Sequence, residues 1–358
     1  MIMKLSSVFR GAAAALLMLP VISCSDYIAT GTFPVKTEDF KTLYTLKGTV
    51  VRDSLPGTKV IYKLWQGGDI LVAADIRTES LHVFSFPGFE PVKTLRMPYS
   101  ISMYGLDFFR SGIRGTVCGI RSRVSGRIDI LTDDLELVQV DSGAVYARPY
   151  NTMSYDDILP TYIDRRNFWF SSINVSSSTE DRAFCRSARG SSSALELYSL
   201  NLVKYPGYDM KLFPWGTSAV YKKGKRAVYA YEQFKVVKFM KMDGSGARTL
   251  DFFRYAGNSS DAKWKYIQGY YRGQVHVGRR AIYLANFEFG SGNLSRICSG
   301  DFPFDPFTTV ETYSYDGEPQ SMFRLDREGM LMVDEKGKKF YILDDSDYTI
   351  RAYDIPGK

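Results

Sequence analysis

The stretch 308–325, TTVETYSYDGEPQSMFRL, decides the fold. Two alternating segments flank Asp316-Gly317, and an Asp-Gly pair suits the tight turn of a β-hairpin. A sixth copy, YTIRAYDIPGK, contains only the first strand of such a hairpin. The four other copies are LHVFSFPGFEPVKTL (81–95), GRIDILTDDLELVQV (126–140), ALELYSLNLVKYP (194–206) and FKVVKFMKMDGSGARTL (234–250). A repeated supersecondary unit predicts a repeat architecture.

A second pair of strands precedes each hairpin, for example at 218–232, 273–287 and 329–345. Four strands in each of six units predict an all-β, six-bladed β-propeller. We expect 40–46 to close the ring by pairing with 348–353, because 39–48 (DFKTLYTLKG) is similar to the outer strand 90–97. A pair of β-sandwiches is the alternative.

The C-terminal run 310–356 and the phrase 81–95 resemble the TolB-like six-bladed propeller lipoproteins of Bacteroidetes. The resemblance covers most of the chain after residue 23, apart from long inserts at 174–193 and 288–307. It implies a propeller in the cell envelope. It implies neither an activity nor catalytic residues, and it compares shape without implying a place in the Tol system.

The N-terminus has the pattern of a bacterial lipoprotein signal. Lys4 and Arg10 precede an apolar segment that ends in Val21-Ile22-Ser23-Cys24. We therefore predict a signal peptide at 1–23, a lipidated Cys24, a tether at 24–36 and a propeller at 37–358. An ordinary secretory signal is the alternative. The predicted location is the outer membrane, facing either the periplasm or the outside.

Composition narrows the function further. The formal net charge is +7, and loss of Lys4 and Arg10 with the leader lowers it to +5, which is too mild and dispersed for a nucleic-acid partner. No Cys/His cluster predicts a metal site or a cofactor. Cys118 lies in an apolar run and is expected to be buried, whereas Cys185 and Cys298 lie in polar segments and could pair.

One face of the disc is predicted to be basic. The turns between the first two strands of five successive units carry clustered Lys and Arg, and clustered charge attracts anionic surfaces. Solvated turns are the alternative interpretation. The candidate basic binding face comprises Arg165, Arg166, Lys225, Arg226, Arg279, Arg280, Lys338 and Lys339.

The opposite face is predicted to carry the long loops 174–193 and 288–307 and the aromatic segment 254–273. Long loops on a rigid scaffold are often functional, and a plain structural insertion is the alternative, which the pattern favours. Aromatic rings could stack on a sugar or pack in the core. The candidate ligand residues on this face are Trp264, Tyr266, Tyr270 and Tyr271.

No catalytic motif stands out in the chain. His82 and His276, the two histidines, lie in strands of different units, where a structural role is the usual one. We therefore predict a non-enzymatic, membrane-anchored scaffold that binds an envelope protein or glycan. The alternatives are an enzyme acting on carbohydrate or envelope polymer at the channel mouth, and a purely structural subunit of an envelope complex.

Overall fold

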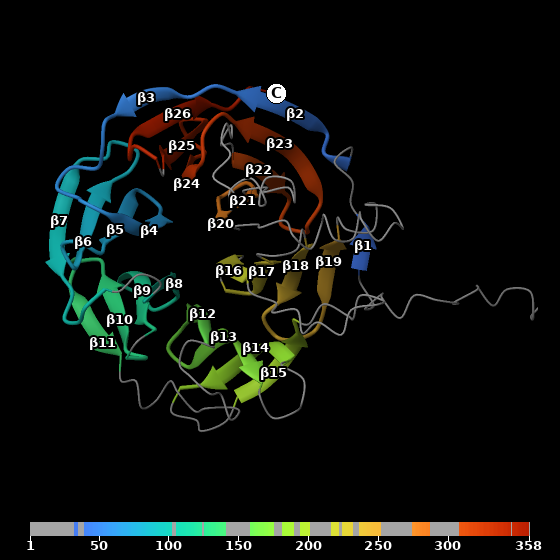
Figure 1. The fold of residues 1–358 in the computed structure, drawn as a ribbon. Coiled ribbons are helices and arrows are strands. Elements are labelled where there is room, and N and C mark those ends of the chain that lie inside the picture. Colours follow the sequence, from blue (N-terminus) through green and yellow to red (C-terminus); the bar gives the residue numbers. More distant parts are fainter. Residues whose placement is uncertain are drawn as a thin grey trace, which may run out of the picture.

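The chain forms a β-propeller arrangement in a computed structural model. The structure describes residues 32–34, 39–101, 105–123, 125–140, 158–174, 181–189, 194–200, 216–221, 224–231, 236–251, 274–286, 308–344 and 346–357. Every regular element within these ranges is a β-strand, and the strands form five sheets around a common centre (Figure 1). The all-β fold class is therefore confirmed.

Two of the sheets have four strands each. The first is β4-β5-β6-β7, with bounds Ile61–Gly67, Ile70–Asp75, Ser80–Ser85 and Pro91–Arg96. The other is β24-β25-β26-β3, with bounds Gly329–Asp334, Lys339–Asp344, Ile350–Asp354 and Thr49–Arg52. The second sheet joins the last strand of the chain, β26, to the third strand, β3.

Two further sheets have five strands, because an N-terminal strand adds to each outer edge in parallel orientation. One is β1-β19-β18-β17-β16, with bounds Thr32–Pro34, Ala247–Asp251, Val236–Lys241, Arg226–Tyr231 and Gly216–Tyr221. The other is β2-β23-β22-β21-β20, with bounds Thr42–Leu46, Pro319–Leu325, Thr308–Tyr313, Ile282–Asn286 and Gln274–Val277.

The remaining sheet has eight strands in the order β11-β10-β9-β8-β12-β13-β14-β15. Its halves meet where β8 and β12 pair in parallel at Arg110–Tyr162 and Ser111–Ile163. The five sheets therefore differ from the six separate sheets that the sequence predicts, because these two inner strands approach closely enough to hydrogen-bond. The bounds are Leu106–Ser111, Thr116–Ser122, Ile128–Thr132 and Leu137–Val140 for β8 to β11, and Leu159–Ile163, Asn167–Asn174, Asp181–Ala188 and Ala194–Ser199 for β12 to β15.

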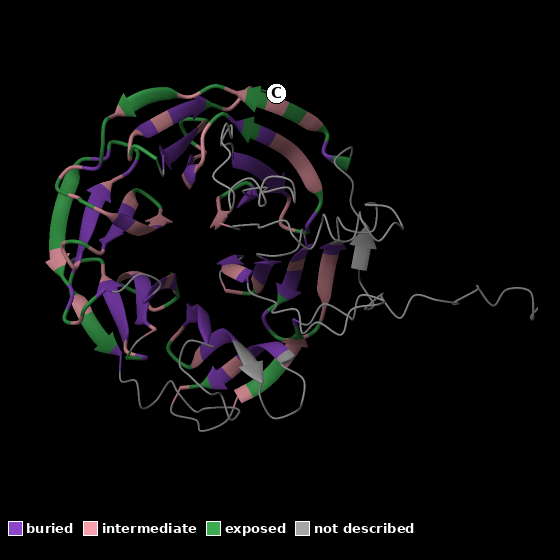
Figure 2. Ribbon diagram, viewed as in Figure 1, coloured by how far each residue is buried: buried purple, intermediate pink, exposed green. Residues whose placement is uncertain are grey.

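Apolar side chains pack between neighbouring sheets. Phe86 and Phe89, next to β6, meet Tyr341 of β25 edge to face, with ring centroids 5.8 and 5.2 Å apart. Burial is concentrated in the inner and middle strands, while the outermost strands are exposed (Figure 2). The core is thus a ring of intersheet layers, in which β-branched and aromatic residues suit the pleated faces.

The predicted closing pair is wrong in its partner. Residues 42–46 pair with β23, whereas 49–52 pair with the C-terminal strand β26. The similarity between 39–48 and an outer strand was real, because β2 does add to an outer edge. The similarity did not indicate which of two adjacent outer edges, that of β23 or that of β26, the segment would join.

Two other expectations in this part of the chain also need correction. The segment 174–193, predicted to be a loop, contains strand β14. The segment 194–206, predicted to be a hairpin, begins with β15, which pairs antiparallel with the preceding strand β14. Polar serines and arginines obscured the strand pattern of β14. Cys185 consequently lies in a buried strand and is a free thiol, as is the buried Cys118, which the sequence placed correctly. Cys298 lies outside the described residues.

The tether predicted at 24–36 includes β1, which pairs with β19 at Thr32–Thr249. Among the residues that the structure describes, no helix has the length and apolar character needed to cross a membrane.

Candidate functional site: the central cavity

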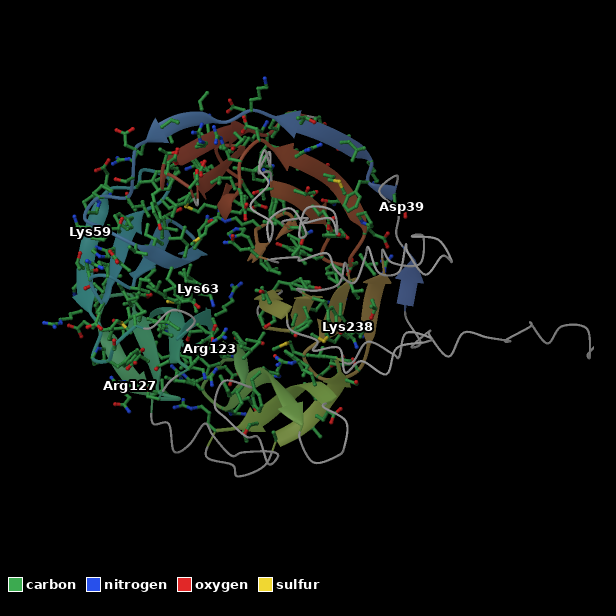
Figure 3. The ribbon with its side chains drawn as sticks, viewed as in Figure 1. Asp39, Lys59, Lys63, Arg123, Arg127 and Lys238 are labelled. Carbon is green, nitrogen blue, oxygen red and sulfur yellow. The ribbon has the colours of Figure 1, made fainter. Side chains whose placement is uncertain are left out.

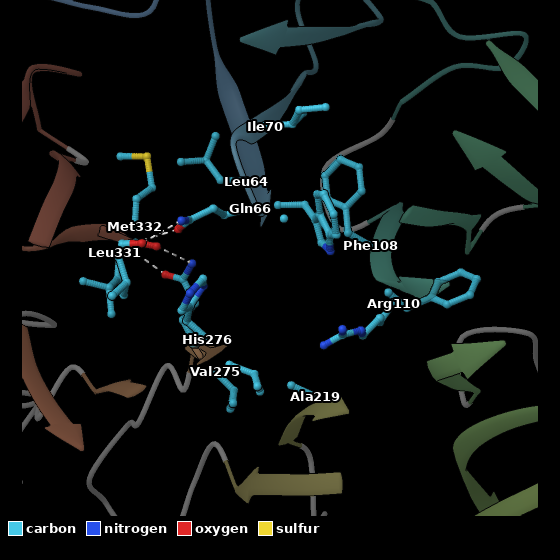
Figure 4. A pocket seen from close by; sticks show the side chains of 18 of the residues that line it. Leu64, Gln66, Ile70, Phe108, Arg110, Ala219, Val275, His276, Leu331 and Met332 are labelled. Carbon is cyan, nitrogen blue, oxygen red and sulfur yellow. Dashed lines mark hydrogen bonds between the residues drawn. The ribbon is translucent and has the colours of Figure 1, made fainter. Parts of the chain in front are cut away.

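The inner strands of the ring surround a cavity with a volume of about 1770 Å³. The inner strands β4, β8, β12, β16, β20 and β24 form most of its wall, together with Ile70 of β5 and Thr116 and Val117 of β9. Figure 4 shows side chains from several of these strands converging on the same space. A cavity of this size exceeds the roughly 300–1,000 Å³ of ordinary small-molecule sites. It is therefore the candidate functional site, and the sequence predicted only that a channel would exist.

Two glutamines hold the inner strand of the C-terminal sheet in this wall. The amide of Gln66 on β4 donates to Val333 O (2.7 Å) and accepts from Val333 N (2.8 Å). The amide of Gln274 on β20 likewise donates to Leu331 O (3.0 Å) and accepts from Leu331 N (2.8 Å). Each side chain imitates a neighbouring strand, so backbone groups of β24 facing the cavity are satisfied.

An ion-pair network lies in the wall between β4 and β8. Lys63 Nζ donates to Asp107 Oδ1 (2.8 Å) and Leu106 O (3.3 Å), and Arg123 binds both Asp107 oxygens at 2.8 Å. Burial by itself would raise the pKa of the Asp107 carboxyl, but Lys63 and Arg123 outweigh burial and hold the pKa well below its ordinary range. The carboxyl therefore stays ionised, while the Lys63 side chain is 36% exposed.

Arg110 is a second cation in the cavity. It lies three residues beyond Asp107 on β8, which at the usual rise of a strand is about 10 Å. Its guanidinium donates to Val220 O (3.1 Å) and extends into the cavity (Figure 4). Figure 3 places Lys63 and Arg123 on the same inner side of the ring.

Aromatic side chains share the wall with these cations. Tyr62, Trp65 and Phe108, from β4 and β8, line the cavity and are only partly buried. The facing wall is mixed, with Val275 and Leu331 beside Gln274 and His276 (Figure 4). Cations and aromatic rings thus gather on the side of the cavity that β4 and β8 form.

His276 on β20 also lines the cavity. Burial lowers its pKa to about 4, against a smaller opposing effect of Glu335. The imidazole is therefore neutral near pH 7. Its ring lies 6.1 Å from that of Tyr283. His82, by contrast, lies away from the cavity between the hydroxyls of Thr78 and Thr94, at 3.2 Å from each, which fits the structural role predicted for it.

The turns that follow the inner strands mark one face of the disc, which we call the AB face. Glu335 of the β24–β25 turn accepts the backbone N–H groups of Arg279 (2.6 Å) and Arg280 (3.0 Å) and the hydroxyl of Tyr283 (2.9 Å). The Glu335 carboxylate therefore links the β24–β25 turn to the β20–β21 turn. A sequence search for clusters of basic residues does not find this acidic residue.

The structure places the candidate basic residues on the AB face, in or beside the turns where the sequence predicted them. Arg165, Arg166, Lys225, Arg279, Arg280 and Lys338 are exposed. Arg226 pairs with Asp316 at 2.6 Å and Lys339 pairs with Asp354 at 2.6 Å. Because each antiparallel sheet returns to this face between its third and fourth strands, acidic outer turns share it. The charge of the AB face is consequently mixed.

The candidate aromatic residues Trp264, Tyr266, Tyr270 and Tyr271 lie outside the described residues, as does the loop 288–307. Neither prediction is tested. Within the described ranges, no three His, Cys, Asp or Glu side chains gather as a metal site would require.

Neither a family model nor a curated protein matches the chain. A member of the DUF4221 family from Bacteroides vulgatus is 10% identical, with a TM-score of 0.54 over 85% of this chain and 94% of that chain. A Bacteroides fragilis protein described as exported is 10% identical, with a TM-score of 0.46 over 88% and 100%. Regucalcin, a calcium-binding protein from Agrobacterium tumefaciens, has the same identity and TM-score over 88% and 96%.

The first likeness supports the fold alone, since folds of this kind serve many functions. The TolB-like resemblance stays a prediction.

Proposed function

We propose that the protein is an exported, lipid-anchored binding protein that takes its ligand in the central cavity. The carrying observation is the cavity of about 1770 Å³, in whose wall cationic and aromatic side chains of β4 and β8 lie beside apolar ones. Such a combination orients a ligand through a few charged contacts and retains it through buried surface.

Binding fits the chemistry of the wall better than catalysis does. A general acid needs a carboxyl whose pKa is raised toward the working pH. Asp107 has the opposite shift, because Lys63 and Arg123 hold it ionised. His276, with a pKa of about 4, is a weak base near neutral pH. These side chains are set to hold charge in place, and less suited to transferring protons.

The proposed architecture is a single six-bladed propeller over 37–358, in which the eight-stranded sheet counts as two blades. Two observations support that count. Each half of the sheet is a run of four antiparallel strands, and the halves share only the β8–β12 pairing. The proposed leader 1–23 and the lipid on Cys24 rest on the sequence pattern.

The test is affinity capture of the lipidated protein from crosslinked native envelopes, with Cys24→Ala as the control that lacks the anchor. Bound proteins and glycans are identified by mass spectrometry. We expect a reproducible partner that binds the lipidated protein and is lost from the control. A capture equal to the control would contradict the proposal, and turnover of a captured glycan would favour the enzyme alternative.

The exposed basic residues of the AB face supply the second arm of this test. Reversal of Arg165 and Arg166 to Glu removes exposed charge while leaving the Arg226–Asp316 pair intact. If the partner binds through this face, capture falls in this variant. If it binds in the cavity, capture is unchanged.

A further inference from the structure

We propose that the central cavity binds an acidic oligosaccharide, whose carboxylates contact Lys63 and Arg110 and whose sugar rings stack on Tyr62 and Trp65. This inference rests on the proposed function and names the ligand class for the same site. Three features of the cavity wall carry the inference: its cations, its aromatic side chains, and the hydrogen bonds that already occupy its strand edges.

The two cations are placed for an anionic ligand with repeated charges. Lys63 is 36% exposed in the cavity, and two of its three N–H bonds point to Asp107 and Leu106. Its remaining donor is available to a ligand. Arg110 projects into the same space from β8, whose Asp107, about 10 Å away between Cα atoms, is the partner of Lys63. Two cations from different strands in one cavity suit a ligand that carries more than one negative charge.

The aromatic residues favour a ring-bearing ligand. Tyr62 and Trp65 flank Lys63 on β4, and the Lys63 ammonium lies 5.9 Å from the Tyr62 ring. Both side chains line the cavity and are partly buried against the intersheet core. Aromatic faces pack well against the apolar faces of sugar rings, and neighbouring charge then selects the acidic sugars.

The strand edges distinguish a glycan from an acidic peptide. A peptide commonly binds by adding a strand to an exposed sheet edge. In this wall Gln66 and Gln274 already occupy edge groups of β24, and β8 and β12 occupy each other. At these positions a peptide strand would have to displace existing hydrogen bonds, whereas a saccharide can be recognised by side chains alone.

The experiment measures binding by calorimetry of the mature protein, expressed without lipid, to an oligogalacturonate of four to six sugars. The same oligomer with methyl-esterified carboxylates is the neutral match, and hexaglutamate is the acidic peptide match. We expect the acid form to bind, the ester to bind at least tenfold more weakly, and added salt to weaken the acid form. Binding of hexaglutamate as tight as that of the uronate would overturn the assignment to a saccharide.

Arg110→Gln and Lys63→Gln are the test variants. Arg96→Gln and Lys93→Gln, on the exposed outer strand β7, are the matched controls. Each cavity variant should weaken uronate binding about tenfold or more, and the controls should leave it unchanged. Lys63→Gln also alters the Asp107 network. If Lys63→Gln unfolds, the result for Arg110→Gln decides the test.

Equal binding by Arg110→Gln and the parent, or no binding to the uronate at millimolar concentration, would overturn the inference. If envelope capture still yields a partner in that case, the binding function stands and only the ligand class fails. If capture fails as well, the proposed function falls with it.

Discussion

Gln66 and Gln274 act as substitutes for backbone at the scale of single residues. Each amide gives and takes one hydrogen bond with β24, one from β4 and the other from β20. The C-terminal sheet is thereby fastened to both of its neighbours along its inner edge. Buried backbone groups left without partners cost about 1–3 kcal/mol each in desolvation.

We expect Gln66→Leu to lower the free energy of unfolding by about 1–3 kcal/mol, because Val333 N and O lose their partners at the cavity wall. Chemical denaturation of the mature protein measures the change. Gln139→Leu, on the exposed outer strand β11, is the control and should shift stability by less than about 0.5 kcal/mol. Equal effects of the two substitutions would contradict the role assigned to Gln66.

His276 predicts a specific dependence of stability on pH. Its pKa is about 4 in the folded protein and 6.5 as the ordinary value, so the unfolded chain takes up the proton more readily. The contribution of His276 is fully present above pH 6.5 and is lost as the pH falls from 6.5 toward 4. Protonation must overcome burial, although Glu335 partly favours the charged form.

His276→Gln should therefore remove part of the stability lost between pH 7 and pH 4.5, by at most about 3 kcal/mol. The measurement compares urea midpoints of the variant and the parent at both values. His82 contributes in the same direction, because burial lowers its pKa too, and it stays constant in the comparison. Parallel curves for parent and variant would show that the pKa of His276 is not lowered in the folded protein.

The N-terminal strands form a strap at the scale of elements. β1, β2 and β3 follow one another along the outer edges of three different sheets (Figure 1). β2 is fastened by the stacked rings of Tyr44 and Phe323, 5.2 Å apart, and β3 covers the edge of β26. The strap protects edges that would otherwise be open to other chains.

Stepwise truncation tests this strap. Chains that begin at Asp39, Gly48 and Asp53 lose β1, then β2, then β3. We expect a small loss of stability from the first step, roughly 1 kcal/mol or less, and a larger one from the second. The third step should be the most damaging, because it leaves the C-terminal sheet with three strands. Thermal unfolding at each length gives the order, and an equal loss at every step would argue against closure through β3.

Two buried cysteines report on the whole molecule. Cys118 in β9 and Cys185 in β14 lie in opposite halves of the eight-stranded sheet and are fully buried. Burial raises the pKa of both thiols, that of Cys185 to about 12, with Glu196 adding to the effect. Since the thiolate is the reactive form, both groups should resist alkylation while the ring is intact.

We expect iodoacetamide to label both cysteines on the order of 100-fold more slowly in the native protein than in denaturant. Peptide mass spectrometry across a urea series follows each site separately. A shared midpoint is expected if the sheets unfold together, because intersheet packing supplies the core. Distinct midpoints would show that the two halves of this sheet unfold independently.

Much of the architecture was predictable from local patterns. Four of the five complete hairpins lie where alternation and turn residues placed them, and Gly317 of the Asp-Gly turn has the positive φ of 83° that such a turn requires. The prediction of a hairpin at 194–206 was wrong, because apolar and polar residues do not alternate clearly in β14, the strand that pairs with β15. The cavity wall was not predictable, since Lys63, Asp107 and Arg110 carry no local motif.

The sequence by itself determined the all-β class, the repeat unit and the turns that carry the basic residues, because each depends on neighbours within a few positions. Only the tertiary structure decided which edges β2 and β3 join, that β8 and β12 merge two units into one sheet, and which side chains face the cavity. Those outcomes depend on contacts between residues far apart in the chain, where similar strands offer nearly equivalent edges. Packing between neighbouring sheets selects among them.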